Sequence, residues 1–349
     1  MTAGQKHEAP AAWPAEDIEP VGACPGCGSS RRAPMFENLE DRIFGAPGRW
    51  TMWRCEDCRS AYLDPRPTAQ SMYRAYREYY THEDARSGEP PSAGLAGGLK
   101  RRLVNGYANR RYATARRPAL PTGALLPLLR PALARSIDYG FRHLPRPWGG
   151  RRLLDIGCGN GAFLLRAREA GWRAAGCDFD PQAVRRARAH GFEIRQGGVE
   201  RFADREGEFE AVTLSHVLEH VHDPRATLLA IYDLLAPGGF LFIDTPNADA
   251  LGLAEYGEAW RGLEPPRHLV IFTWQAVRAM LSATGFAGIV ERPFREAATG
   301  IWRKSELIRR GSSPYAKRAL PKQAFAHLPP AARIAPGRTE FVTVTARRP

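Results

Sequence analysis

A glycine-rich stretch in the middle of the chain constrains the fold more than any other feature. Residues 153–161 read LLDIGCGNG, a short apolar run that ends at a glycine and leads into a segment of helical period. Glycines at such a strand-to-helix turn let the backbone bend sharply and approach a ligand closely. The stretch therefore predicts an α/β fold with a ligand at the carboxyl end of a strand.

The sequence from residue 151 onward extends this prediction to a whole sheet. Apolar runs of strand length alternate with segments of helical period, which predicts a parallel sheet with helices on both faces. The last run, at 341–348, alternates with period two, which indicates an edge position or antiparallel pairing. The predicted strands are 151–156, 172–178, 192–197, 209–215, 240–247, 286–293 and 341–348, and the predicted helices are 160–171, 181–190, 223–239 and 273–285.

Two kinds of ligand fit the glycine-rich loop. Gly157, Gly159 and Ala162, with Asp178 further on, match the dinucleotide fingerprint. Asp155 stands at the strand end, where a carboxylate would repel a pyrophosphate and favour a positively charged ligand. S-adenosylmethionine has no phosphate and carries an ammonium and a sulfonium, so the charge favours it over NAD.

Five motifs, in order along the chain, resemble those of class I S-adenosylmethionine-dependent methyltransferases. They are LLDIGCGNG (153–161), GCDFD (176–180), FEAVTLSHVLEHVHDP (209–224), LLAPGGFLFIDTPN (234–247) and EPPRHLVIFTWQAVRAML (264–281). The resemblance implies an enzyme of class EC 2.1.1.- with a Rossmann-like fold, whose seven-stranded, mostly parallel sheet has an antiparallel last strand.

The resemblance also implies which residues hold the cofactor. Asp155 and the loop glycines would hold the methionine end, Asp178 would accept both ribose hydroxyls, and Phe179 would lie against the adenine. The turn around Gly198 would lie at the adenine edge, and Ser215 would lie beneath the sulfonium. The full set is Asp155, Gly157, Gly159, Gly161, Asp178, Phe179, Gly198, Val199 and Ser215.

Four cysteines near the start of the chain form two CxxC pairs, Cys24 with Cys27 and Cys55 with Cys58. Two such knuckles provide the four thiolates of a closed tetrahedral Zn²⁺ site, which is structural because no position stays open. Iron in the same cage and a pair of redox CxxC motifs are the alternatives. Zinc knuckles before such a domain resemble zinc-ribbon methyltransferases, including sugar C-methyltransferases, although those usually carry a longer C-terminal domain.

Three histidines are candidate catalytic residues. His216 and His220 follow the predicted fourth strand, where the ligand crevice of a parallel sheet opens, and His268 follows the fifth. A histidine can take a proton from a hydroxyl at neutral pH. The alternative is a structural role for these side chains, since methyl transfer needs mainly proximity and alignment.

The net charge of +13 is concentrated in two segments. Residues 100–117 contain seven basic and no acidic residues, and residues 292–338 contain eleven basic and two acidic ones. An arginine-rich proteome and a real basic binding surface both explain this pattern. The chain shows no apolar run of transmembrane or signal-peptide type, so we expect a cytoplasmic protein.

We divide the chain into a disordered tail (1–20), a zinc-binding module (21–64), a helical connector with a flexible part at 83–99 (65–148), and a cofactor-binding domain with a basic insertion at 295–338 (149–349). Tyrosines at 73, 76, 79 and 80 have helical spacing and either cover a substrate or pack between the module and the core.

The favoured function is O- or C-methylation of a small molecule or glycosyl precursor in secondary-metabolite or cell-surface glycan biosynthesis. An RNA methyltransferase that uses the basic segments is one alternative, so nucleic acid is a partner that we do not favour. A scaffold that binds S-adenosylmethionine without turnover is the other alternative.

Overall fold

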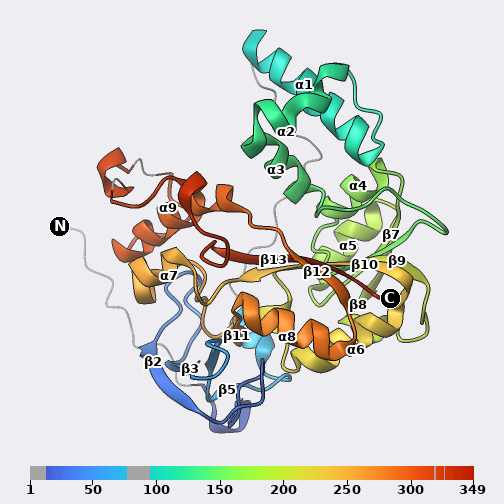
Figure 1. Ribbon diagram of the computed structural model, residues 1–349. Helices are drawn as coiled ribbons and strands as arrows, with labels where there is room; N and C mark the ends of the chain where they lie inside the picture. Colours follow the sequence, from blue (N-terminus) through green and yellow to red (C-terminus); the bar gives the residue numbers. More distant parts are fainter. Residues whose placement is uncertain (1–12, 77–94, 318–319, 326) are drawn as a thin grey trace.

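The computed structural model of the chain describes residues 13–76, 95–317, 320–325 and 327–349, and its centre is a seven-stranded sheet (Figure 1). The strand order is β12-β13-β10-β9-β6-β7-β8, and β13 runs antiparallel to both of its neighbours. The predicted fold class is thus confirmed, but β13 lies inside the sheet and β12 lies at its edge. The strands are β6 (Arg152–Ile156), β7 (Arg173–Asp178), β8 (Glu193–Gln196), β9 (Phe209–Ser215), β10 (Leu235–Pro246), β12 (Ala287–Glu291) and β13 (Phe341–Arg347).

Helices cover both faces of this sheet. Successive side chains of a strand point to opposite faces, and both sets are mostly apolar here, so each face is buried under helices. Leu154 and Ile156 of β6 belong to the core formed with α6 and α8, whereas Leu153 belongs to the core formed with α4 and α5. The side chains of Asp223 and Thr273 cap α6 and α8. These helices are α4 (Ala162–Glu169), α5 (Pro181–Ala189), α6 (Pro224–Leu234) and α8 (Trp274–Thr284).

A helical lobe projects from the sheet at the top of Figure 1. It contains α1 (Leu95–Tyr112), a 3₁₀ turn at Pro121–Leu125, α2 (Leu126–Leu129) and α3 (Pro131–Gly140). A Cβ atom at Gly106 of α1 would lie 1.8 Å from the carbonyl oxygen of Leu120, so only glycine allows this close packing. The expected flexible stretch at 83–99 is wrong for residues 95–99, which begin α1, and its remainder lies outside the described residues.

The cysteine pairs lie beside a second, four-stranded sheet of order β11-β4-β3-β2, at the bottom of Figure 1, and Cys55 is the one of the four that belongs to a strand. Three of its strands, β2 (Arg32–Leu39), β3 (Trp50–Cys55) and β4 (Ala61–Leu63), come from the predicted module. The fourth, β11 (Val270–Ile271), comes from the cofactor-binding domain and pairs with β4. The module is therefore completed by a strand 200 residues further along the chain rather than being a separate unit.

The predicted disordered tail is wrong for its last residues. Trp13 is buried against Trp50, with ring centroids 5.2 Å apart, and β1 (Ile18–Glu19) pairs with β5 (Arg66–Pro67). Apolar burial of the Trp13 ring offsets the cost of ordering this segment. Residues 1–12 lie outside the described residues.

The segment predicted as a basic insertion helps to build a third core with the module. Glu340, just before β13, accepts hydrogen bonds from the indole nitrogens of Trp260 (2.7 Å) and Trp302 (2.8 Å). These bonds satisfy the polar atoms of two buried aromatic side chains. The elements here are α7 (Leu251–Tyr256), α9 (Ala298–Arg309) and 3₁₀ turns at Gly257–Ala259, Arg295–Ala297, Lys322–Phe325 and Ala331–Arg333.

Candidate active site

The glycine-rich loop joins β6 to α4 in the predicted way. Gly157, Gly159 and Gly161 all have left-handed backbones, with φ of 69°, 53° and 85°. A Cβ atom at Gly157 would lie 2.4 Å from Val217, whereas a Cβ atom at Gly159 would meet nothing within 4 Å. The loop is thus tightly packed at its first glycine and open at its second, where a ligand can approach the backbone.

Asp155 is fully buried at the end of β6, and the sequence did not indicate its partner. Arg142, which follows α3, forms an ion pair with its carboxylate, and Thr213 donates a hydrogen bond of 2.9 Å to the same oxygen, Oδ1. This pairing compensates the charge on which our choice between S-adenosylmethionine and NAD relied, so that argument is weaker than the sequence suggested. The other oxygen, Oδ2, is buried without a partner among the described residues, and burial raises the pKa of the carboxyl.

Asp178 lies at the end of β7, next to the loop. Its carboxylate accepts hydrogen bonds from the backbone N–H groups of Gly159 (2.8 Å) and Asp180 (2.9 Å). The Phe179 side chain is 73% exposed, and its Cζ lies 3.2 Å from the Cβ position of Gly198. Phe179 and Gly198 therefore lie side by side as an open apolar surface beside Asp178, and Val199 starts a 3₁₀ turn (Val199–Phe202) next to them.

These residues fit S-adenosylmethionine. The unpartnered Oδ2 of Asp155 suits the ammonium of its methionine part, because a buried acceptor without a donor is costly. The exposed ring of Phe179 suits an adenine, and Asp178 suits the ribose hydroxyls. Ser215 lies half-buried at the end of β9, and its part in binding stays a prediction.

The three predicted histidines lie around one buried carboxylate, Glu219. Glu219 belongs to a 3₁₀ turn (Leu218–His220) that follows β9, and its Oε2 accepts a hydrogen bond of 2.9 Å from Thr245 of β10. Its Oε1 lies 3.3 Å from Nδ1 of His216 and 4.0 Å from Nε2 of His268. Neighbouring strand ends thus bring together residues that are far apart in the sequence.

His216 differs from the other two histidines in the direction of its pKa shift. Its ring lies between Glu219 and Asp244, with Nε2 3.4 Å from an Asp244 oxygen. Burial lowers the pKa of His216, but the hydrogen bond to Glu219 and the charge of Asp244 outweigh this and raise the pKa above its usual value. Asp244 is also held by the hydroxyl of Tyr139 from α3, at 2.7 Å.

His220 and His268 are held by backbone carbonyls. Nδ1 of His220 lies 2.9 Å from the carbonyl oxygen of Arg267, and Nδ1 of His268 lies 2.7 Å from that of Gly262. Because a carbonyl can only accept, each Nδ1 carries the proton and each Nε2 keeps its lone pair. Burial lowers the pKa of both side chains, so both are neutral at pH 7.

Two residues from the N-terminal part of the chain support this cluster, one directly and one through Arg267. The Tyr76 hydroxyl, at the end of a 3₁₀ turn (Met72–Tyr76), lies 3.2 Å from Nδ1 of His220. Tyr76 is one of the tyrosines noted in the sequence. Tyr73 points to solvent with 57% exposure, and residues 79 and 80 lie outside the described residues.

The other residue is Asp41, which follows β2. Its carboxylate binds both Nη atoms of the buried Arg267, at 2.8 and 3.0 Å. Arg267 is the residue whose carbonyl holds His220. Neither Asp41 nor Arg267 carries a sequence signal that would pair them, because they are 226 residues apart.

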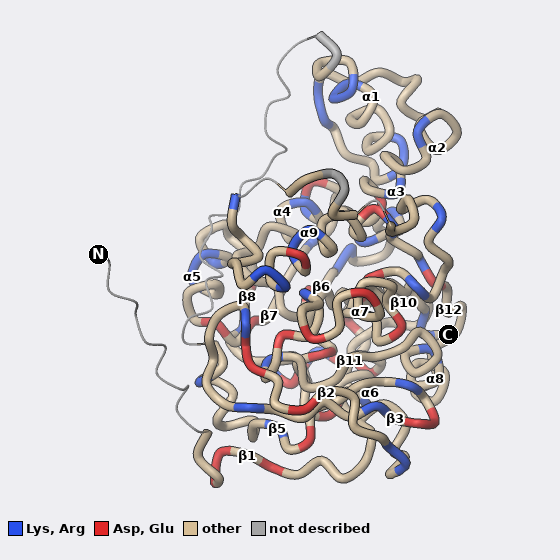
Figure 2. Tube along the Cα trace, turned by 90° about the vertical axis from the view of Figure 1, so that its left-hand side faces the viewer, with Lys and Arg blue, Asp and Glu red and all other residues tan. Residues whose placement is uncertain are grey.

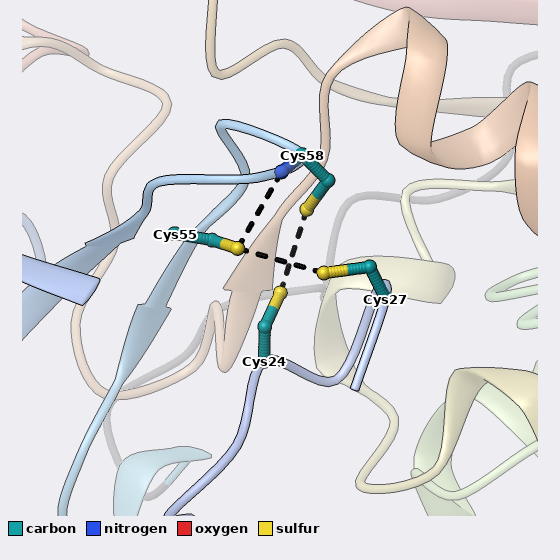
Figure 3. Close-up of side chains that lie close together, drawn as sticks. All are labelled: Cys24, Cys27, Cys55 and Cys58. Atoms are coloured by element: carbon teal, nitrogen blue, oxygen red, sulfur yellow. Dashed lines mark hydrogen bonds between the residues drawn. The ribbon is translucent and has the colours of Figure 1, made fainter. Parts of the chain in front are cut away.

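The four predicted metal ligands do come together. Cys24 and Cys58 have sulfurs 3.5 Å apart, as do Cys27 and Cys55, and the four point toward a common centre (Figure 3). Sulfurs bound tetrahedrally at about 2.3 Å from zinc lie about 3.8 Å apart, so the spacing fits. No disulfide joins the four cysteines. Burial raises the pKa of Cys27 to about 11, whereas the hydrogen bond with Cys24 lowers the pKa of Cys58 to about 5, so a cation would be needed for all four to ionise.

Within the described residues, one other group could hold a metal ion, namely Glu219, His220 and His268, whose ligand atoms lie within 4.8 Å of one another. No helix among these residues is long and apolar enough to cross a membrane.

Known proteins resemble part of the chain. The ubiquinone biosynthesis O-methyltransferase of Xanthomonas oryzae pv. oryzae (strain PXO99A) is 34% identical over 166 residues, which are 45% of this chain and 66% of that protein. The protein of the same name from Aromatoleum aromaticum is 41% identical over 105 residues, which are 28% of this chain and 45% of that protein. The chain thus spans two thirds or less of these relatives' lengths.

Among solved structures, a SAM-dependent methyltransferase from Archaeoglobus fulgidus matches with a TM-score of 0.43 and 20% identity over 62% of this chain and 93% of that one. The methyltransferase domain family matches residues 112–291, which is just over half of the chain. The chain therefore belongs to the methyltransferase domain family and carries a class I S-adenosylmethionine-dependent methyltransferase domain.

Proposed function

We propose that this protein transfers a methyl group from S-adenosylmethionine to a hydroxyl of a small-molecule or glycosyl acceptor, with His220 as the general base. The observation that carries the proposal is the fixed tautomer of His220. Its Nδ1–H faces the Arg267 carbonyl at 2.9 Å, so Nε2 is free to accept a proton. The relatives, which are named O-methyltransferases, support transfer to oxygen.

His220 is better placed for this role than His268. His220 is half-buried, whereas His268 is 4% exposed and lies behind it, with ring centroids 4.8 Å apart. The exposed Tyr76 hydroxyl lies 3.2 Å from Nδ1 of His220. The greater exposure of His220 therefore favours it over His268, whose ring packs against it.

The chemistry follows from these positions. The acceptor hydroxyl gives its proton to Nε2 of His220, and the negative charge of Glu219 stabilises the imidazolium that forms. When bound, S-adenosylmethionine would supply the methyl group, with the electron pair of the broken S–C bond left on sulfur. Asp155 and Asp178 would hold the two ends of the cofactor.

We also propose that Cys24, Cys27, Cys55 and Cys58 bind a structural zinc ion. Four thiolates leave no open position for chemistry, and binding of the ion would add to the folding free energy of the module. The site would fix β4, and through β4 it would fix β11 and the loop that carries Arg267 and His268.

The test of the base is the variant His220→Gln. Removing a general base costs about 10²- to 10⁴-fold in kcat. The affinity for S-adenosylhomocysteine should stay within about twofold, since His220 does not touch the cofactor residues. Release of S-adenosylhomocysteine is measured with a panel of phenolic, catecholic and sugar-nucleotide acceptors.

His222→Gln is the matched control, because His222 is two residues away and bonds the Pro67 carbonyl at 2.9 Å instead. It should keep wild-type kcat. Equal kcat for His220→Gln and wild type would refute the assignment of the base. Loss of activity on dialysis against EDTA, at unchanged zinc content, would show that Glu219, His220 and His268 bind a catalytic metal instead.

A further inference from the structure

The helical lobe formed by residues 95–137 carries charge of one sign only. It contains nine basic residues and no acidic residue, and the first acidic residue after it is Asp138. Asp138 faces inward, where the hydroxyls of Tyr107 and Tyr112 donate hydrogen bonds to it. In Figure 2 the tube of α1 and α2 accordingly shows blue and tan without red. The lobe is therefore a strongly positive surface at one end of the molecule.

The same lobe exposes large apolar side chains at its outer turn. Leu125, Leu128 and Leu129 are 48%, 81% and 69% exposed, whereas Leu126 is 3% exposed. Leu125 ends the 3₁₀ turn and Leu128 and Leu129 lie on the single turn of α2 that follows it, so the three exposed leucines are close together along the chain. Leucines this exposed in a cluster are unusual on a soluble surface, which indicates that this face meets an apolar phase or a partner.

Basic residues flank this leucine face. Arg130 follows it directly and is exposed, and Lys100, Arg101 and Arg102 are exposed on the first half of α1. The carbonyl of Arg102 accepts a hydrogen bond of 2.9 Å from the N–H of Leu120, which fixes the leucine segment across this part of α1. Apolar side chains bordered by lysine and arginine are the signature of a surface that lies in the headgroup region of an anionic bilayer.

We propose that the α1–α3 lobe docks this protein onto the surface of anionic lipid membranes, with Leu125, Leu128 and Leu129 inserted and the basic residues of α1 and Arg130 against the headgroups. Attachment is peripheral, through one turn of helix. The lobe is joined firmly to the sheet by α3, since Arg135 binds Glu296 at 2.6 Å and Tyr139 binds Asp244, so the docked face and the active site move together.

Two other occupants fit these observations less well. A second copy of the lobe would bring two surfaces of the same charge together, because the lobe has no acidic residue and only Arg116 and Arg135 of its nine basic residues pair with Glu169 and Glu296 outside it. Single-stranded nucleic acid is held by exposed aromatic rings in a basic groove, but Tyr107 and Tyr112, the aromatic residues of this segment, are 6% and 1% exposed. Neither the charge of a second lobe nor the absence of exposed aromatic rings for nucleic acid accounts for the exposed leucines.

The test is co-sedimentation of the full chain with vesicles at physiological salt. Vesicles of phosphatidylcholine alone are compared with vesicles that contain about one third phosphatidylglycerol, and the second kind should bind the protein at least about tenfold more strongly. The variants Leu128→Ser/Leu129→Ser and Arg101→Gln/Arg102→Gln should each weaken this binding about tenfold or more.

Matched controls come from equally exposed positions elsewhere. Leu229→Ser removes a leucine of α6 that is 53% exposed, and Arg185→Gln/Arg278→Gln removes two exposed arginines of α5 and α8. Both controls should bind vesicles as wild type does. Circular dichroism and affinity for S-adenosylhomocysteine should be unchanged in every variant, which separates loss of docking from loss of folding and from the proposed activity.

Three results would overturn the proposal. The first is equal binding to neutral and anionic vesicles, or no binding to either. The second is a dimer, seen by equilibrium sedimentation without vesicles, that the double leucine variant dissociates. The third is tight binding of single-stranded RNA at physiological salt that the double arginine variant abolishes while anionic vesicles do not compete.

Discussion

The buried ion pair between Asp41 and Arg267 gives the sharpest prediction about how the N-terminal module supports the active site. Both side chains are 0% exposed, and two N–H···O contacts of 2.8 and 3.0 Å join them. Asp41→Asn keeps the shape of the side chain but removes its charge, so a buried guanidinium loses its bidentate carboxylate. Breaking one side of such a pair costs about 3–5 kcal/mol.

Urea unfolding followed by tryptophan fluorescence and circular dichroism measures this loss. With a slope of about 3 kcal/mol per molar urea, the midpoint should fall by about 1 M or more. The matched control is Glu258→Gln, because Glu258 pairs with the neighbouring Arg42 at 2.9 Å and both side chains are more than 40% exposed. That pair also joins the module to the methyltransferase domain, yet its loss should cost only about 0–1 kcal/mol.

The pair also predicts a pH dependence with a definite sign. Burial raises the pKa of Asp41, but the hydrogen bonds and charge of Arg267 outweigh this and bring the pKa below its usual value. A carboxyl with a depressed pKa stabilises the fold above its unfolded pKa of about 3.9 and loses that contribution as the pH falls through the folded value. Wild type should therefore lose more stability than Asp41→Asn in acid below about pH 4.

The same variant tests the link to catalysis, because Arg267 holds His220 through its carbonyl. Asp41→Asn should lower kcat while leaving the affinity for S-adenosylhomocysteine within about twofold. A cost for Asp41→Asn no larger than that of Glu258→Gln would refute the argument.

Two further predictions concern the cofactor and the metal. Asp178→Ala should weaken S-adenosylhomocysteine binding by about tenfold to a hundredfold, since hydrogen bonds to a charged group are worth about 1.5–3 kcal/mol, and unchanged affinity in calorimetry would contradict the assignment. Wild type should contain one zinc per chain by metal analysis, and Cys55→Ser should release it and lower kcat through β11, whereas Cys177→Ser, a buried cysteine far from the knuckles in sequence, should retain the zinc.

Most of the sheet could be predicted from the sequence, because its strands are short apolar runs between strong helix signals. The strand predicted at 209–215 is β9 to the residue, and the helix predicted at 181–190 is α5 with one extra residue. The position of β13 could not be predicted. Its period-two pattern is typical of an edge, but α8 covers part of it and β12 adds to its outer side.

The sequence predicted several residues of the candidate site but not the ion pairs that hold them. Loop glycines, Asp178 and the histidines stand in local patterns that a single sequence displays. Arg142 and Asp41 do not, because each is one charged residue among 87 in the chain and acquires meaning only when folding buries it beside an opposite charge. An ion pair between residues more than 200 positions apart, such as Asp41 and Arg267, produces no periodic pattern in the sequence.

The candidate site is therefore not confined to one of the segments into which the sequence divides the chain. The domain at 149–349 supplies the cofactor loop and the histidines, but Asp155 is neutralised by Arg142 of the helical segment and His220 is held through Asp41 of the cysteine module. The module in turn lacks its fourth strand without β11. Each of the three parts supplies a buried contact to another part, as Arg142 does to Asp155 and Asp41 does to Arg267.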